Sequence, residues 1–217
     1  TMEKDNSIHG MKSKDASNVR KQGHIREEER QKILLKNGIK CEILGGTIKP
    51  DIKREDNILE SVKGAKKTQW FLFSHKHVNK YNKFTQSEKE IFTKWGSCYT
   101  TPNPYCEEMC ETIKKDPKKW VRFFIGTDKF DLMVIKDERN GEWFEFESEY
   151  FIDKLMSRVV EIYYTGTKVV FKGGGLDVWP NKKRRRNGVI LMELDRRSSK
   201  KLSLFHSPLD KIIDCVK

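Results

Sequence analysis

The hydrophobic pattern of the chain changes abruptly after Gly38, and this change constrains the fold more than any other feature. Residues 24–36 have helical character, with three glutamates near the start, where negative charge suits the helix dipole. Asn37-Gly38 then forms a helix stop, because both residue types accept the left-handed conformation. Three strand-like stretches separated by turn residues follow: residues 39–44, 47–53 and 58–65. We therefore predict a helix followed by a three-stranded meander.

The rest of the chain mixes helix and strand signals, which predicts a mixed α/β (α+β) fold. Helices are expected over residues 66–81, 87–95, 107–115 and 148–159, with a buried strand as the alternative for the first. Strands are expected over residues 120–126, 130–136, 143–146, 169–172, 176–179 and 188–195. Residues 1–23 contain hardly any apolar side chain, so we expect a flexible basic arm before a single domain over residues 24–217.

The charge balance indicates a polyanionic partner. The chain has 44 Lys and Arg against 32 Asp and Glu, a formal charge of +12. Nucleic acid is the commonest partner of such a surface, although a lysine-rich solvated surface would give the same balance. The longest apolar run, residues 70–73, is far shorter than the roughly 20 residues that span a bilayer. No apolar stretch follows the first lysines and the five cysteines have no disulfide-scaffold spacing, so we expect a cytoplasmic protein with free thiols.

The second and third strands of the meander carry a set of residues suited to phosphodiester hydrolysis. If Asp51 faces Ser61 across a turn centred on Asp56, Lys63 lies on the same face, because strand side chains alternate with period two. Metal-dependent cleavage needs a carboxylate on the metal and a cation beside the attacking water, which Asp51 and Lys63 can supply. The backbone carbonyl of Val62 can serve as a further ligand, because hard cations accept peptide oxygens.

These residues resemble a known family. Residues 46–51 (Gly-Thr-Ile-Lys-Pro-Asp), followed ten residues later by Ser61-Val62-Lys63, look like the nuclease motif PD-(D/E)XK of type II restriction endonucleases and repair nucleases. Residues 65–70 also resemble the sequence that follows the motif lysine in several restriction enzymes. The resemblance implies a central mixed sheet flanked by helices, with Asp51 binding Mg²⁺ and Lys63 orienting water. It further implies a double-stranded DNA substrate, no organic cofactor, and a homodimer for palindromic targets.

The chain departs from the motif at Ser61, where the family has an acid. The helix before the meander is the expected source of the missing carboxylate, because Glu29 falls on the inward side of its helical wheel. Glu28 is nearly as well placed. A bulge at Leu59-Glu60 is the alternative, since it would turn Glu60 toward the site.

Basic clusters elsewhere predict contacts with DNA phosphates, and one arginine could read guanine in the major groove. They comprise Lys66 and Lys67 beside the motif, Lys182, Lys183, Arg184, Arg185 and Arg186 in one loop, and Arg196 and Arg197 further on. Solvated turns would have the same composition.

Two further interpretations remain open. Cys98, Cys106 and Cys110, with His75 and His77 upstream, could bind zinc, but their spacing fits no common zinc pattern and ordinary thiols are expected. The chain could also be a DNA- or RNA-binding protein without catalysis, in which Asp51 and Lys63 form a salt bridge between strands. A structure-specific or repair nuclease would use the same site chemistry.

Overall fold

The computed structural model describes residues 13–45, 50–65, 68–173, 189–196, 202–208 and 213. These residues form a mixed α/β protein, as the sequence predicts. They pack into two compact units rather than around one centre. The first unit comprises residues 1–64 and 129–146, and the second comprises residues 65–128 and 147–217.

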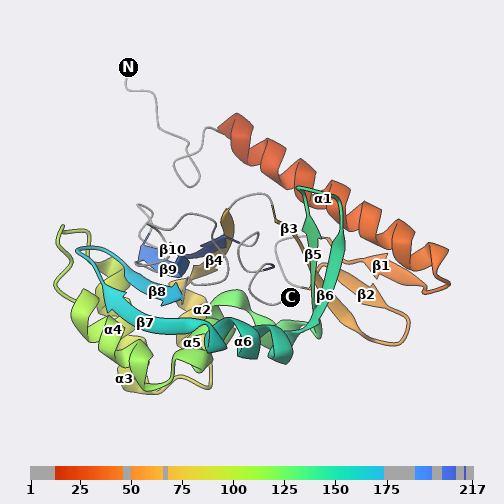
Figure 1. Cartoon of the computed structure of the whole chain (residues 1–217). Helices are drawn as coiled ribbons and strands as arrows, with labels where there is room; N and C mark the ends of the chain where they lie inside the picture. Colours follow the sequence, from red (N-terminus) through yellow and green to blue (C-terminus); the bar gives the residue numbers. More distant parts are fainter. Residues whose placement is uncertain are drawn as a thin grey trace. The chain divides into compact units, whose positions relative to one another are not determined.

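The first unit is a helix and a five-stranded sheet. Its elements are α1 (Ser13–Lys36), β1 (Cys41–Ile43), β2 (Ile52–Arg54), β3 (Leu59–Ala65), β5 (Leu132–Asp137) and β6 (Trp143–Glu147), with strand order β1-β2-β3-β5-β6. β1, β2 and β3 form the predicted antiparallel meander, and α1 lies along the sheet (Figure 1). The amide of Asp131 donates to the carbonyl of Leu59 at 2.8 Å, so β5 begins beside the start of β3 and the sheet is mixed.

Helix α1 is longer than predicted. Residues 13–23, expected to belong to a flexible arm, form its first turns, where lysine, alanine, arginine and glutamine favour helix without an apolar face. The helix ends at Lys36, as predicted, because Gly38 adopts a φ of 78° and the amide of Asn37 bonds to the carbonyl of Ile33 at 3.1 Å.

The packing of α1 distinguishes the two faces of the first sheet. Leu34 of α1 packs in a buried cluster with Ile52, Val62 and Val134 from three strands. We call the face that carries these side chains the helix face. Because side chains alternate along a strand, Ser61 and Lys63 lie on the opposite face, which we call the site face.

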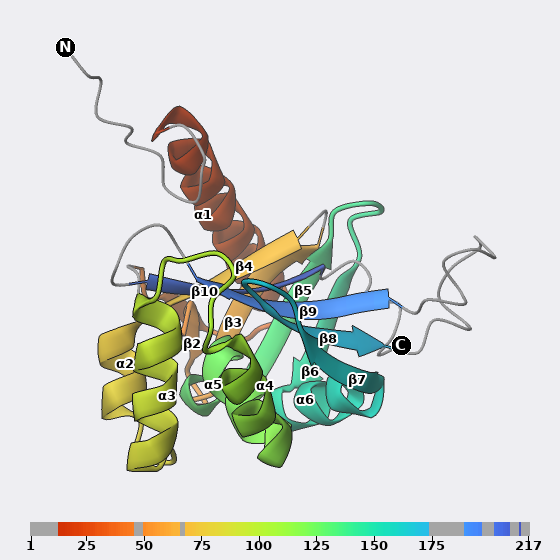
Figure 2. The ribbon, with the colours of Figure 1, turned by 90° about the vertical axis from the view of Figure 1, so that its left-hand side faces the viewer.

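The second unit is an antiparallel sheet covered by helices. Its strands, in spatial order, are β4 (Thr68–Ser74), β10 (Leu202–Pro208), β9 (Val189–Arg196), β8 (Val169–Gly173) and β7 (Val159–Tyr164). Its helices are α2 (His75–Lys80), α3 (Gln86–Ser97), α4 (Cys106–Lys115), α5 (Pro117–Ile125) and α6 (Ser148–Ser157), and a short 3-10 turn, η1 (Thr127–Lys129), follows α5. The helices gather on one side of this sheet (Figure 2). None of the helices in the described ranges combines the length and apolarity needed to cross a bilayer.

Two elements of the second unit differ from the sequence prediction. Residues 66–81 were expected to form a helix, but the aromatic run forms β4, which pairs with β10 along its whole length. Residues 120–126 were expected to form a strand, but they belong to α5. Asp116 caps this helix, Pro117 begins it, and Gly126 ends it with a φ of 80°.

Helix α3 begins at Gln86, one residue before the predicted start. Thr85 caps it and forms a reciprocal capping box with Glu88. Strands β7 and β10 were not predicted at all. β7 pairs with β8, the next strand along the chain, whereas β10 pairs with the preceding strand β9 and with the distant strand β4.

Candidate functional site

The β2–β3 hairpin holds the candidate site. Its ladder pairs Ile52 with Glu60 and Lys53 with Leu59, which is the predicted register around Asp56. Asp51 lies immediately before the paired residues, and its amide donates to the carbonyl of Glu60 at 2.8 Å. The register therefore places the Asp51 side chain beside the third strand of the meander.

The carboxylate of Asp51 is the centre of the site. Its Oδ2 accepts hydrogen bonds from the amide of Val62 at 2.7 Å, from Lys63 Nζ at 2.9 Å and from Ser61 Oγ at 3.3 Å. The predicted grouping of Asp51, Ser61 and Lys63 is thus confirmed as geometry. Solvent still reaches the pair, because the Asp51 side chain is 17% exposed and that of Lys63 is 14% exposed.

Two oxygen atoms of the site converge on one cation. Lys63 Nζ contacts Asp51 Oδ2 at 2.9 Å and also the carbonyl oxygen of Val62 at 3.0 Å. Carboxylate and peptide oxygens are the donors that hard divalent cations prefer. The donor set therefore fits Mg²⁺ chemically, with Ser61 Oγ as a third oxygen beside Asp51.

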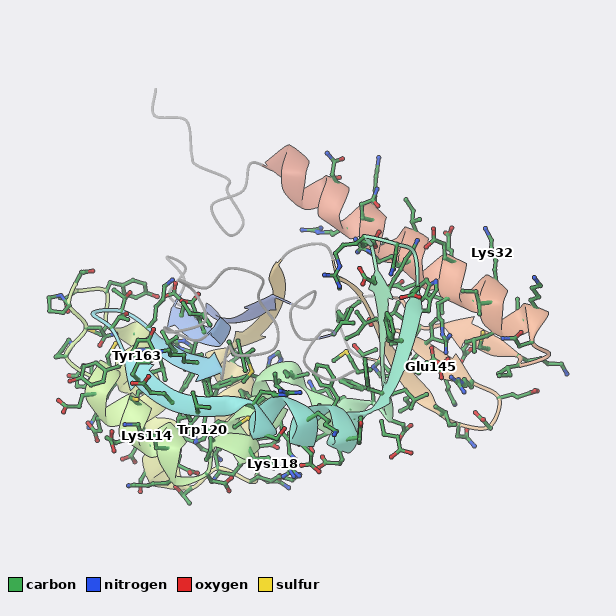
Figure 3. All side chains as sticks on the ribbon, viewed as in Figure 1. Lys32, Lys114, Lys118, Trp120, Glu145 and Tyr163 are labelled. Atoms are coloured by element: carbon green, nitrogen blue, oxygen red, sulfur yellow. The ribbon has the colours of Figure 1, made fainter. Side chains whose placement is uncertain are left out.

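Glu60 does not belong to this group. Its carboxylate is fully buried and accepts hydrogen bonds from Arg30 of α1 and from Arg54 of β2. Both cations lie on the helix face, and Glu145, labelled in Figure 3, reaches Arg30 from β6. The suggested bulge at Leu59-Glu60 is wrong, because both residues pair regularly with β2.

The glutamates of α1 are not brought to Asp51 either. Glu29 forms an ion pair with Lys136 of β5 at 2.6 Å, and Lys136 lies two residues from Val134 on the helix face. Glu28 is exposed. The inward position of this turn belongs to Arg30, whose side chain is 3% exposed.

Arg30 and Arg54 were not among the residues predicted from the sequence to lie near the site. Arg30 lies four residues before Leu34, so the helical spacing places it on the buried stripe, and this signal was available. Burial by itself lowers the pKa of Arg30, but hydrogen bonds and charge attraction from Glu60 and Glu145 outweigh burial and raise that pKa above its ordinary value. The guanidinium therefore stays charged inside the unit.

Gly64 is the residue after the site lysine, and it lies beneath an ion pair. Arg26 of α1 and Glu138 pair directly over it on the helix face. A Cβ at position 64 would overlap the Arg26 guanidinium and approach Glu138 Oε1 to 2.8 Å. A larger residue at this position would therefore have to displace the ends of these two flexible side chains.

Most of the predicted DNA-binding residues fall outside the described residues. These are Lys66, Lys67, Lys182, Lys183, Arg184, Arg185, Arg186 and Arg197. Arg196 ends β9, but its side chain is also outside the described part. Their contacts with DNA stay predictions.

The cysteines do not form a metal centre in the described part of the chain. Cys41, Cys98, Cys106 and Cys110 are thiols outside any disulfide, as predicted. Cys106 and Cys110 are buried one turn apart on α4, and burial raises the pKa of the Cys110 thiol. Among the described residues there is no group of three or more His, Cys, Asp or Glu side chains that could hold a metal ion.

No protein-family model matches the chain, and no curated protein matches it.

Proposed function

We propose that the chain is a Mg²⁺-dependent endonuclease that hydrolyses phosphodiester bonds of double-stranded DNA at a specific short sequence, as type II restriction enzymes do. The observation that carries the proposal is the convergence of the Asp51 carboxylate, the Val62 carbonyl and the Lys63 ammonium within 3.0 Å. A helix followed by an antiparallel meander in a mixed sheet supports the restriction-endonuclease-like fold that the motif resemblance implies.

Each residue of the site has a role in this mechanism. Asp51 and the Val62 carbonyl would hold Mg²⁺, and the bound ion would polarise the scissile phosphate and balance its developing charge. The Val62 amide and the Ser61 hydroxyl orient the carboxylate by donating to it. The positively charged ammonium group of Lys63 would lie beside the attacking water. It would orient that water and stabilise the hydroxide formed from it.

The charge of the chain supports DNA binding, and the proposed recognition elements belong to its C-terminal half. The excess of 12 positive charges attracts the phosphate backbone, and the basic clusters at residues 182–186 and 196–197 are the proposed contacts. A palindromic target would be matched by a homodimer, because two-fold protein symmetry suits two-fold DNA symmetry.

One observation favours a second candidate. Lys63 Nζ already pairs with Asp51, as it would in a salt bridge that only joins two strands. A nucleic-acid-binding protein without catalysis would contain the same pair.

A plasmid digest with matched variants tests the proposal. Purified protein is incubated with supercoiled plasmid in Mg²⁺, and DNA binding is measured separately in Ca²⁺ by fluorescence anisotropy. We expect discrete fragments from the wild type, and a loss of cleavage of about 10²-fold or more in Asp51→Asn and Lys63→Met, with binding retained. Smeared products or cutting at junctions would indicate a repair or structure-specific nuclease instead.

The chain provides a matched control for these variants. Glu29 and Lys136 also form an ion pair, at 2.6 Å, on the opposite face of the same sheet. Glu29→Gln and Lys136→Met should therefore cleave like the wild type. Binding without cleavage in wild type and all four variants would support the non-catalytic candidate and refute the nuclease.

A further inference from the structure

Helix α2 of the second unit presents a polar, positively charged outer side. Its inner side is fixed by packing: Val78 is fully buried, and the ring of His75 meets Phe92 of α3 edge-on, with 5.4 Å between centroids. α2 lies beside α3 (Figure 2). The other four residues of the helix are all exposed: Lys76, His77, Asn79 and Lys80. The exposed side of α2 therefore carries two lysines on a helix that is held in place from within.

The positive charge of α2 is not neutralised. Residues 61–87 contain no Asp or Glu, so no acid lies near the helix in sequence. In the ranges that the structure describes, neither Lys76 nor Lys80 forms an ion pair, whereas Lys83, just after the helix, pairs with Asp128 at 3.0 Å. Lys76 and Lys80 are four residues apart and so lie one turn apart on the same side, where like charges repel. An anion bound between them would relieve that repulsion.

Helix α5 of the same unit shows the contrasting case. It also contains no acid, but each of its three cations pairs with an acid of another helix: Lys118 with Asp153, Lys119 with Glu88 and Arg122 with Glu149. Helices α3, α4 and α6 carry acids beside their own lysines. Of the described helices in the second unit, α2 is therefore the one whose lysines have an acid neither on the same helix nor in an ion pair.

We infer that the exposed side of α2 contacts neighbouring phosphates of double-stranded DNA through Lys76 and Lys80. This inference rests on the proposed function and names a DNA-contacting surface in addition to the basic clusters already proposed. Lysine displaces the counterions that condense on DNA, and asparagine at position 79 adds a side chain that can donate to phosphate. The exposed side has no apolar side chain, which a helix lying on a membrane surface would need.

The salt dependence of DNA binding tests this contact. Each phosphate contact steepens the fall of the logarithm of the binding constant with the logarithm of salt concentration by about 0.9. The probe is a short fluorescent duplex of arbitrary sequence, titrated by anisotropy in EDTA so that no cleavage occurs. The slope is compared between wild type, Lys76→Ala, Lys80→Ala and the double variant.

We expect each single variant to lower the slope by about 0.9 and the double variant to lower it by about 1.8. Between roughly 50 and 200 mM salt, the wild-type affinity should then fall about 12-fold further than that of the double variant. The control is a double variant that combines Lys114→Ala and Lys118→Ala, at two paired lysines labelled in Figure 3. It removes the same net charge and should keep the wild-type slope. Circular dichroism checks that both double variants are folded.

Three results would overturn the inference: no duplex binding by the wild type, an unchanged slope in the double variant of Lys76 and Lys80, or an equal loss in the control. Vesicles of anionic phospholipid are a second probe. Loss of vesicle binding with an unchanged DNA slope would assign the surface to a membrane instead.

Failure of this inference is distinguishable from failure of the proposed function. The expected slopes without plasmid cleavage in Mg²⁺ would support the contact and refute the nuclease. Cleavage by the wild type together with unchanged slopes would refute the contact and leave the nuclease.

Discussion

Replacing Glu60 with glutamine tests whether this buried acid stabilises the first unit or serves the reaction. The carboxylate is fully buried and accepts bonds of 2.9 Å from Arg30 Nε, 2.9 Å from Arg30 Nη2 and 2.6 Å from Arg54 Nε. Glutamine keeps one acceptor oxygen but places an NH₂ group against a guanidinium. Two cations would then remain inside the unit, and among the described residues Glu145, whose side chain is 47% exposed, is the acid still paired with them.

The expected loss is about 3–5 kcal/mol in the free energy of unfolding, the usual cost of removing one partner from a buried ion pair. Glu29→Gln is the control, because its carboxylate is 39% exposed and its pair with Lys136 contributes about 0.2–1 kcal/mol. Urea denaturation followed by circular dichroism measures both variants, with the slope against urea expected to match that of the wild type.

The same variant separates stability from catalysis. At a temperature where Glu60→Gln is folded, it should cleave DNA at the wild-type rate, because Glu60 lies on the helix face, away from Lys63. A loss of stability below about 1 kcal/mol would refute the argument from buried charge. A folded Glu60→Gln protein without cleavage would show that Glu60 serves the site.

Two further predictions concern local structure. Gly64→Ala should lose less than the roughly 1–3 kcal/mol of overpacking a rigid core, because its Cβ would meet only the ends of the flexible Arg26 and Glu138 side chains, and a larger loss in the same urea assay would contradict this. At Glu88, burial raises the pKa, but hydrogen bonds from Lys119 and Thr85 outweigh burial and hold that pKa below its ordinary value. The stabilisation from the Glu88 carboxylate is therefore complete above its pKa in the unfolded chain. It is lost as the pH falls through the lower pKa of Glu88 in the folded protein. The difference in unfolding free energy between wild type and Glu88→Gln should shrink steadily below about pH 4.5 and vanish in acid, and a difference independent of pH would contradict the proposed charge effect.

Local sequence signals predicted the hairpin well. The turn centred on Asp56 and the two-residue alternation of strands were sufficient to bring Asp51, Ser61 and Lys63 together. The end of α1 was also predictable, because Asn37-Gly38 stops a helix whatever surrounds it. These features depend on residues close in sequence. The backbone preferences of those residues and the short loops between them are enough to determine such features without tertiary contacts.

Tertiary contacts decided the features that sequence patterns could not. An aromatic run such as residues 70–73 suits a helix or a strand, and pairing with β10, more than a hundred residues later, makes it a strand. Helical spacing from Leu34 placed Arg30 on the inward stripe of α1, but the acids that pair with Arg30 there depended on the sheet. Arg30 is buried because Glu60 and Glu145 neutralise it there, and Glu29 is drawn to Lys136. The sequence by itself therefore determined the hairpin that carries the candidate site, whereas only the folded unit determined that Glu29 pairs with Lys136 instead of Asp51's neighbours, because ion pairing depends on distance in space.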